Sequence, residues 1–269
     1  NKASQHSLQH REQRLRLESF HKSNPSDRAL REAWENLGNP DRWVRHAARV
    51  ALERQPVDNW RTLFEKETNN RASIHASLAL ARKAPVHRRA ALAKLSNLNF
   101  DSLNEEDQLA YLRTLAIASK VKPAPPLELL AIITPQLDAA YPASSDALNM
   151  ELSRILSRLE PKGFINKTLN LLQTRRSSRP DVDFAILKQN PTYGDRFQRF
   201  AENPADSLGL HLAFMASHAD AENWRPAQIQ RLASWLREAL KHAPKGTNYH
   251  DVINRLSENV DNALTPDVR

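Results

Sequence analysis

The segment that most constrains the fold is residues 37–52, which join a helix end, a tight turn and a helix start. Gly38 has the freedom to adopt the left-handed backbone that often ends a helix, and Pro40 cannot continue one. Asp41 is a favoured N-cap, because its carboxylate accepts hydrogen bonds from the first backbone amides of the next helix. The segment therefore predicts two helices packed against each other across a short turn.

The helix expected after this turn carries an apolar face. Its members recur at helical spacing and are Trp43, Ala47, Val50 and Ala51. The small alanines allow a neighbouring helix to approach closely. Aromatic residues at such positions are usually core residues, so we expect the rings of Trp43 and the other tryptophans to be buried. A role in stacking on bases or sugars would require exposed rings.

Similar units recur along the chain. Helix starts after proline breaks fall near residues 26, 57 and 86, and Ser26 and Asn104 stand where N-caps are expected. Such spacing is typical of helix-pair repeats, which bury a continuous core only when several units stack. Glycine is scarce and no strand-like alternation persists. The sequence predicts an all-α fold, a HEAT-like α-solenoid of about 12–14 helices.

We expect three parts within this fold. Residues 1–25 are rich in charge and sparse in apolar side chains, which indicates a charged N-terminal segment or a capping helix. Residues 26–174 hold the HEAT-like helical repeats. Residues 175–269 read as a less regular helical continuation of the same solenoid, and its weakest helical pattern lies in residues 181–204.

The net charge of +8 is concentrated towards the N-terminus. Residues 1–100 hold 19 Lys and Arg against 10 Asp and Glu, whereas the remaining residues hold 20 against 21. A basic part of this kind suits an acidic partner or nucleic acid. The interpretation we favour is the solvated surface of an arginine-rich helical protein, because charge runs usually serve solubility.

Several kinds of chemistry are excluded or unsupported. Without cysteine, this segment cannot form disulfides, zinc–thiolate sites, iron–sulfur clusters or covalent c-type haem links. The ten histidines form no metal-ligand motif, and no phosphate-binding glycine loop or nucleophile motif occurs. We therefore expect no catalytic residue, cofactor or metal here. Because the sequence has no apolar run of 18 residues, we expect no membrane span and no signal peptide in it. The start at Asn1 indicates a piece of a longer polypeptide.

The candidate binding residues are Arg42, Arg45 and Arg49. Their spacing places them on one stripe, roughly opposite the alanine-rich face. On the concave surface of a solenoid, such a stripe binds an acidic partner or phosphates. Arg45 has a second role open to it, since Asp41 can pair with it and such pairs hold stacked repeats together. We therefore expect Asp41 and Arg45 to be structural, and keep Arg42 and Arg49 as candidate partner-binding residues.

The turn residue Asp41, the pair Val44-Arg45 and the alanine-rich second helix resemble a HEAT repeat. Longer runs, taken together, resemble the helical region of large multidomain proteins from planctomycetes and their relatives. These runs are residues 40–56 with Trp60, residues 141–143, 148–152 and 167–172, and residues 249–264, which resemble the final helix of that region. The resemblance covers most of residues 11–264, with residues 174–205 poorly matched.

In such proteins this region lies between a sorbosone-dehydrogenase-like β-propeller and a c-type cytochrome domain with a Cys-x-x-Cys-His motif. The resemblance implies a spacer within an exported redox protein of the periplasm or cell envelope. Its partners would be other domains of the same polypeptide or a separate protein. No catalytic or haem residue carries over, because neither flanking domain is present in this sequence.

We therefore expect a non-catalytic scaffold that positions neighbouring redox domains or docks a protein partner. The alternative, from another class, is a nucleic-acid-binding helical-repeat protein that uses the basic N-terminal part, with or without base-repair activity. That alternative needs Lys and Arg concentrated on the concave side of the solenoid and, for repair, a catalytic carboxylate there. A stand-alone hydrolase has no motif to support it.

Overall fold

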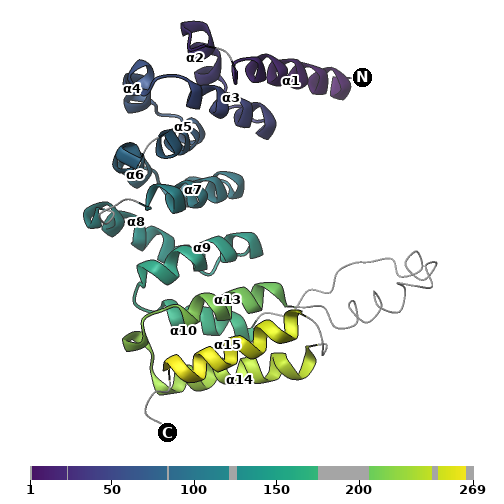
Figure 1. The fold of residues 1–269 in the computed structure, drawn as a ribbon, viewed down its shortest axis with the longest axis vertical. Coiled ribbons are helices and arrows are strands. Elements are labelled where there is room, and N and C mark those ends of the chain that lie inside the picture. Colours follow the sequence, from purple (N-terminus) through teal and green to yellow (C-terminus); the bar gives the residue numbers. More distant parts are fainter. Residues whose placement is uncertain are drawn as a thin grey trace, which may run out of the picture. The chain divides into compact units, whose positions relative to one another are not determined.

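The computed structural model describes residues 2–22, 24–83, 85–120, 126–174, 206–243 and 248–264. Over these ranges the protein has thirteen α-helices, three short 3-10 helices and no strand, which confirms the predicted all-α class. The chain divides into two compact units, residues 1–140 and residues 141–269 (Figure 1). The three-part division at residues 25 and 174 stays a prediction, and residues 181–204 lie outside the described residues.

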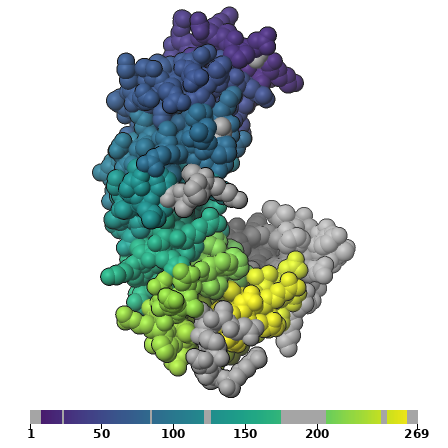
Figure 2. All heavy atoms as spheres, turned by 60° about the vertical axis from the view of Figure 1, so that its left-hand side comes forward, coloured from purple at the N-terminus to yellow at the C-terminus, as the bar shows by residue number. Residues whose placement is uncertain are grey.

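The described residues of unit 1 form eight α-helices. They are α1 (Lys2–Ser19), α2 (Asp27–Glu35), α3 (Arg42–Arg54), α4 (Val57–Lys66), α5 (Asn70–Lys83), α6 (Arg88–Ser96), α7 (Glu105–Ala118) and α8 (Leu127–Ala139). Helices α1, α3, α5 and α7 contact one another in succession, and α2, α4 and α6 pack against α3, α5 and α7 respectively. In the space-filling view the atoms of unit 1 follow one another in chain order from purple to teal (Figure 2).

Side chains at the predicted N-caps start three of these helices. The Ser26 hydroxyl accepts a hydrogen bond from the Ala29 amide at 3.2 Å, and the Asn104 side-chain oxygen accepts one from the Asp107 amide at 3.0 Å. Asp41 caps α3 in the same way. Each cap satisfies amides that have no partner inside the helix, so the predicted starts at these residues are confirmed.

Aromatic rings fill the core of unit 1. The Trp60 ring is fully buried, with its centroid 6.2 Å from that of Trp34 and 6.3 Å from that of Phe64. Phe100, in the connection before α7, lies edge-on to Tyr111 at 5.3 Å. Edge-to-face and tilted pairs of this kind add to the stabilisation that comes from burial alone.

Gly38 does not adopt the left-handed conformation that the sequence predicts. Among the described residues only Glu160 and Gly163 have a positive φ, and α2 ends at Glu35 before a turn. A Cβ atom on Gly38 would lie 3.2 Å from the side-chain oxygen of Asn69. Glycine at this position therefore provides room for the start of α5 rather than a special backbone angle.

Unit 2 contains five described α-helices. They are α9 (Asp146–Leu159), α10 (Phe164–Thr174), α13 (Ser207–Ser217), α14 (Pro226–His242) and α15 (Asn248–Leu264). Helix α13 contacts α9, α10 and α15, and α14 contacts α10 and α15. Tyr141 is buried before α9, and its hydroxyl lies 2.9 Å from the hydroxyl of Thr168. In the described part of the chain, none of the helices combines the length and apolarity that crossing a bilayer requires.

Candidate partner-binding surface

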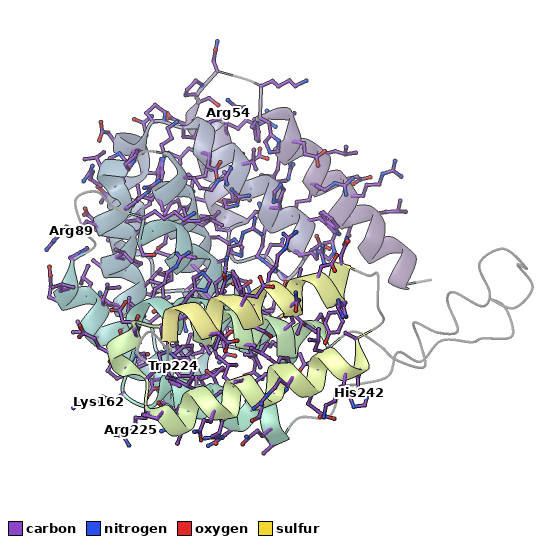
Figure 3. All side chains as sticks on the ribbon, turned by 60° about the horizontal axis from the view of Figure 1, so that its bottom comes forward. Arg54, Arg89, Lys162, Trp224, Arg225 and His242 are labelled. Atoms are coloured by element: carbon purple, nitrogen blue, oxygen red, sulfur yellow. The ribbon has the colours of Figure 1, made fainter. Side chains whose placement is uncertain are left out.

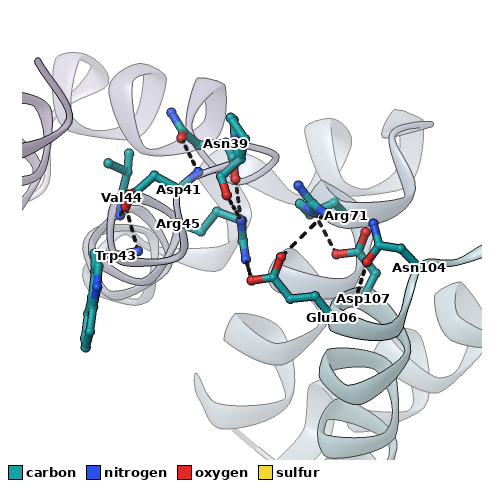
Figure 4. A network of polar contacts seen from close by, with 10 residues as sticks. Asn39, Asp41, Trp43, Val44, Arg45, Arg71, Asn104, Glu106 and Asp107 are labelled. Carbon is teal, nitrogen blue, oxygen red and sulfur yellow. Dashed lines mark hydrogen bonds and ion pairs between the residues drawn. The ribbon is translucent and has the colours of Figure 1, made fainter. Parts of the chain in front are cut away.

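The side chain of Asp41 is engaged at the start of α3. One carboxylate oxygen accepts hydrogen bonds from the amides of Trp43 and Val44 at 2.8 and 2.9 Å (Figure 4). The other oxygen lies 3.6 Å from Nδ1 of His10 on α1. These contacts join the turn before α3 to the first turn of α3 and to α1.

Arg45 is buried, with 3% of its surface exposed. Its Nη1 donates hydrogen bonds to the backbone oxygens of Asn39 at 2.6 Å and Pro40 at 2.8 Å. Its Nη2 donates to the carboxylate of Glu106 on α7 (Figure 4). Arg45 thus pairs with Glu106 rather than with Asp41, whose two carboxylate oxygens face the first amides of α3 and His10.

A second ion pair continues this network on α5. Arg71 Nε donates to Asp107 at 2.7 Å, and its Nη2 lies 3.7 Å from Glu106 (Figure 4). The hydrogen bond to Asp107 raises the pKa of Arg71 above its ordinary value. The pairs Arg45–Glu106 and Arg71–Asp107 therefore connect α3, α5 and α7. Helices α3 and α5 each provide one arginine, and α7 provides both acidic side chains.

Arg49 is also buried, with 8% of its surface exposed. Its guanidinium pairs with Glu53 one turn later, and its Nη2 lies 3.2 Å from Nδ1 of His46. Burial, with repulsion from Arg82, lowers the pKa of Arg49 even though Glu53 opposes the shift. Because the guanidinium is enclosed and paired, Arg49 offers little surface to a partner.

Arg42 and Trp43 lie on the solvent side of α3. Arg42 is exposed, and its guanidinium carbon is 4.4 Å from the centroid of the Trp43 ring, a cation–π contact. Trp43 is 54% exposed, so the prediction that this ring is a core residue is wrong. Helix α3 is covered by α1, α2 and α5, and these neighbours bury Val44 and Ala48 in its place.

A pocket of about 460 Å³ lies between α1 and the start of α3. Its lining residues are His10, Arg11 and Arg14 on α1, Asp41, and Trp43 on α3. Arg14 pairs with Glu18 at 3.3 Å, whereas Arg11 is exposed and makes no hydrogen bond or ion pair within the described residues. The pocket combines an exposed aromatic ring with cationic side chains, a combination suited to ligands with a ring and negative charge.

Unit 2 contains a different pocket, of about 490 Å³, at the connection between α9 and α10. Its charged lining is mixed, with Lys162 and Arg225, which lie near each other in Figure 3, and the acids Glu160 and Glu222. The Glu160 carboxylate already accepts hydrogen bonds from the Asp220 amide and the Asn223 side chain. These contacts give the Glu160 carboxylate a structural role in joining two loops.

The histidines supply no cluster for a metal ion. Across the described ranges no group of three or more His, Cys, Asp or Glu side chains comes close enough to hold one. Burial lowers the pKa of His75 on α5 to about 4, with Arg45 and Arg49 adding repulsion. Its Nδ1 is buried without a hydrogen-bond partner.

The lowered pKa of His75 predicts a pH-dependent stability. Between about pH 6.5 and 4 the unfolded chain binds a proton at this residue that the folded protein does not. The contribution of neutral His75 to the free energy of unfolding is therefore complete above pH 6.5. It is lost as the pH drops towards 4, by up to about 3 kcal/mol. Urea unfolding at a series of pH values should show a weaker pH dependence for His75→Gln than for the parent. A constant difference between the two proteins would contradict the assignment to His75.

The structure thus separates the four predicted residues. Asp41 and Arg45 contact the turn and neighbouring helices, Arg49 is enclosed, and Arg42 lies exposed beside Trp43. The sequence carries a partial signal for the Arg45 partner, because acidic residues follow Asn104 in the first turn of a helix, where the helix dipole favours them. It carries none for Arg71. Comparison of the chain with models of known protein families, with curated proteins and with solved structures finds no match.

Proposed function

We propose that this chain is a non-catalytic helical-repeat scaffold, a HEAT-like α-solenoid that positions neighbouring domains or docks a protein partner. The observation that carries this proposal is the ion-pair network on the row α3, α5 and α7, in which Arg45 and Arg71 pair with Glu106 and Asp107. Stacked helical repeats are stabilised mainly by contacts between neighbours. A network that connects three successive helices of one row is a contact of this kind.

The order of helix contacts in unit 1 supports the same proposal. The odd-numbered helices contact one another in succession, and each of α2, α4 and α6 packs on the helix that follows it. A repeat arrangement of this type gives a broad surface whose shape is fixed by packing rather than by a bound ligand. Its mechanism is therefore geometric, since it holds bound proteins or domains at set positions.

The resemblance to planctomycete multidomain proteins adds a domain context and a cellular location to the proposal. We place the chain as a spacer in an exported redox protein of the periplasm or cell envelope, with cofactors bound by other domains of that polypeptide. On this proposal the segment itself binds no cofactor. We favour Arg42 as the residue that contacts the partner, because its side chain is exposed.

The complete coding sequence tests this proposal first. We expect it to encode folded domains beside this segment, with a β-propeller upstream and a Cys-x-x-Cys-His motif downstream if the redox setting holds. In the native polypeptide, amine-reactive cross-linking should join exposed lysines such as Lys66 and Lys83 to one of those domains or to one protein. A coding sequence without further domains, together with no cross-link to any other protein, would contradict the scaffold function.

The alternative function, nucleic-acid binding, is favoured by one specific observation. An exposed tryptophan lies among arginines in the pocket between α1 and α3. That pocket lies in the part of the chain where the positive charge is concentrated. A base-repair activity has no comparable support, because Asp41, the one acid among the described residues that line this pocket, accepts hydrogen bonds from backbone amides.

A further inference from the structure

The pocket between α1 and α3 contains an aromatic ring that the fold does not need for its core. Trp43 is 54% exposed, whereas Trp60 in the same unit is fully buried. An exposed tryptophan beside a pocket is a common feature of binding surfaces, because its large ring gives contact area with little loss of conformational freedom. The ring therefore has both the exposure and the surroundings needed to contact a ligand.

The charged side chains around this ring are mostly arginines, and some of them form no ion pair with the described residues. Arg42 lies over the ring at 4.4 Å, and Arg11 lines the same pocket without a hydrogen bond or ion pair to the described residues. Arg14 contributes a third guanidinium, paired with Glu18. One oxygen of the Asp41 carboxylate accepts the first amides of α3, and the other lies 3.6 Å from Nδ1 of His10. An anion entering the pocket meets the guanidinium of Arg11, and Arg42, on the Trp43 ring at its edge, adds a second positive charge; neither group pairs with an acid among the described residues.

We propose that this pocket binds single-stranded nucleic acid. One base stacks on the ring of Trp43, and the adjacent phosphates pair with Arg11 and Arg42. Proteins that bind single strands combine aromatic rings for the bases with basic side chains for the backbone, the two features that meet here. This inference rests on the alternative function named above, nucleic-acid binding, and it shares Arg42 with the proposed scaffold. The cross-links that test the scaffold do not depend on oligonucleotide binding, so the two proposals fail separately.

The chemistry of the pocket favours a single strand over two other anionic ligands. In a duplex the bases are stacked on one another and cannot lie on a protein ring without being flipped out. An acidic peptide offers carboxylates to the arginines but no flat ring beside each charge. A nucleotide unit carries an aromatic face and a phosphate a short distance apart, which matches the arrangement of Trp43 and the guanidinium groups.

Fluorescence anisotropy of a labelled oligothymidylate of about eight nucleotides tests the proposal, with the whole chain at low and rising salt. A matched oligomer with the same phosphates and no bases separates stacking from charge. We expect the parent to bind the oligothymidylate at least about fivefold more tightly than the abasic oligomer, from the usual strength of one base–ring stack. We expect Trp43→Ala to lose this difference while binding the abasic oligomer unchanged.

Two further variants keep the result interpretable. Trp43→Phe retains an aromatic face and should retain most of the preference, whereas Trp43→Leu removes it and covers the case in which Trp43→Ala misfolds. The double variant Arg11→Ala with Arg42→Ala should weaken the binding of both oligomers and reduce the slope of the salt dependence by about 1.4 units, about 0.7 for each arginine. Arg31→Ala, at an exposed arginine on α2 that does not line the pocket, is the matched control and should change neither.

The proposal is overturned if the parent does not bind the oligothymidylate at low salt, or binds the abasic oligomer equally well. Unchanged binding by Trp43→Ala and Trp43→Leu overturns it too. Competition by an oligoglutamate of equal charge as effective as that by unlabelled oligothymidylate would instead assign the pocket to an acidic peptide. Preference for a duplex of the same sequence would likewise contradict a stacking site.

Discussion

Replacing Trp60 by alanine is expected to lower the free energy of unfolding of unit 1 by about 3–5 kcal/mol. The Trp60 ring is fully buried, tilted against Trp34 and edge-on to Phe64, so its removal leaves a cavity between side chains of α2 and α4. The measurement is urea unfolding followed by far-ultraviolet circular dichroism, because the substitution also removes a fluorophore.

Trp43→Ala is the matched control for this prediction. It removes the same side chain in the same unit, but from a position that is 54% exposed, so we expect a loss of about 1 kcal/mol or less. Because both variants replace tryptophan by alanine, the difference between their losses of stability measures the effect of burial alone. Equal losses for the two variants would mean that Trp43 is packed in solution in a way that its exposure does not indicate.

Replacing Arg45 by alanine is expected to destabilise unit 1 by about 3 kcal/mol. The guanidinium donates to the Asn39 and Pro40 oxygens and to Glu106 from a position that is 3% exposed. Without it the two carbonyl groups lose a charged donor and α7 loses a contact to α3. Thermal or urea unfolding measures the change.

Arg42→Ala provides the comparison at an exposed arginine three positions earlier, where we expect a change of about 0.5 kcal/mol or less. Arg45→Lys keeps the charge but cannot donate to three acceptors from one planar group, so it should recover only part of the loss. A double-mutant cycle of Arg45→Ala with Glu106→Ala should give a coupling energy of about 1 kcal/mol or more. Strict additivity would show that the ion pair contributes nothing beyond the two backbone contacts.

The features that could be predicted from the sequence are those fixed by a few neighbouring residues. Ser26, Asp41 and Asn104 were identifiable as helix starts because an N-cap depends only on a side chain and the amides two or three residues later. The period of the apolar residues likewise indicated an all-α protein. Such local rules need no knowledge of which helices become neighbours.

The features that could not be predicted depend on distant residues. Arg45 pairs with Glu106, which is 61 positions away, so no spacing rule within one helix could identify the partner. Trp43 was expected in the core because a single buried face was assumed for its helix. With α1, α2 and α5 around α3, the buried surface is wider and centred elsewhere, and the ring at the helix start lies outside it.

The ion pair between Arg45 and Glu106 has a mechanical consequence. It joins α3 to α7 directly, in parallel with the 61 positions of chain that connect them through α4, α5 and α6. When unit 1 is stretched along this direction, we expect the ion pair to share the tension with the packing of α5 against α3 and α7. The segment then lengthens only after both have broken, so residues far apart in the chain set its resistance to extension.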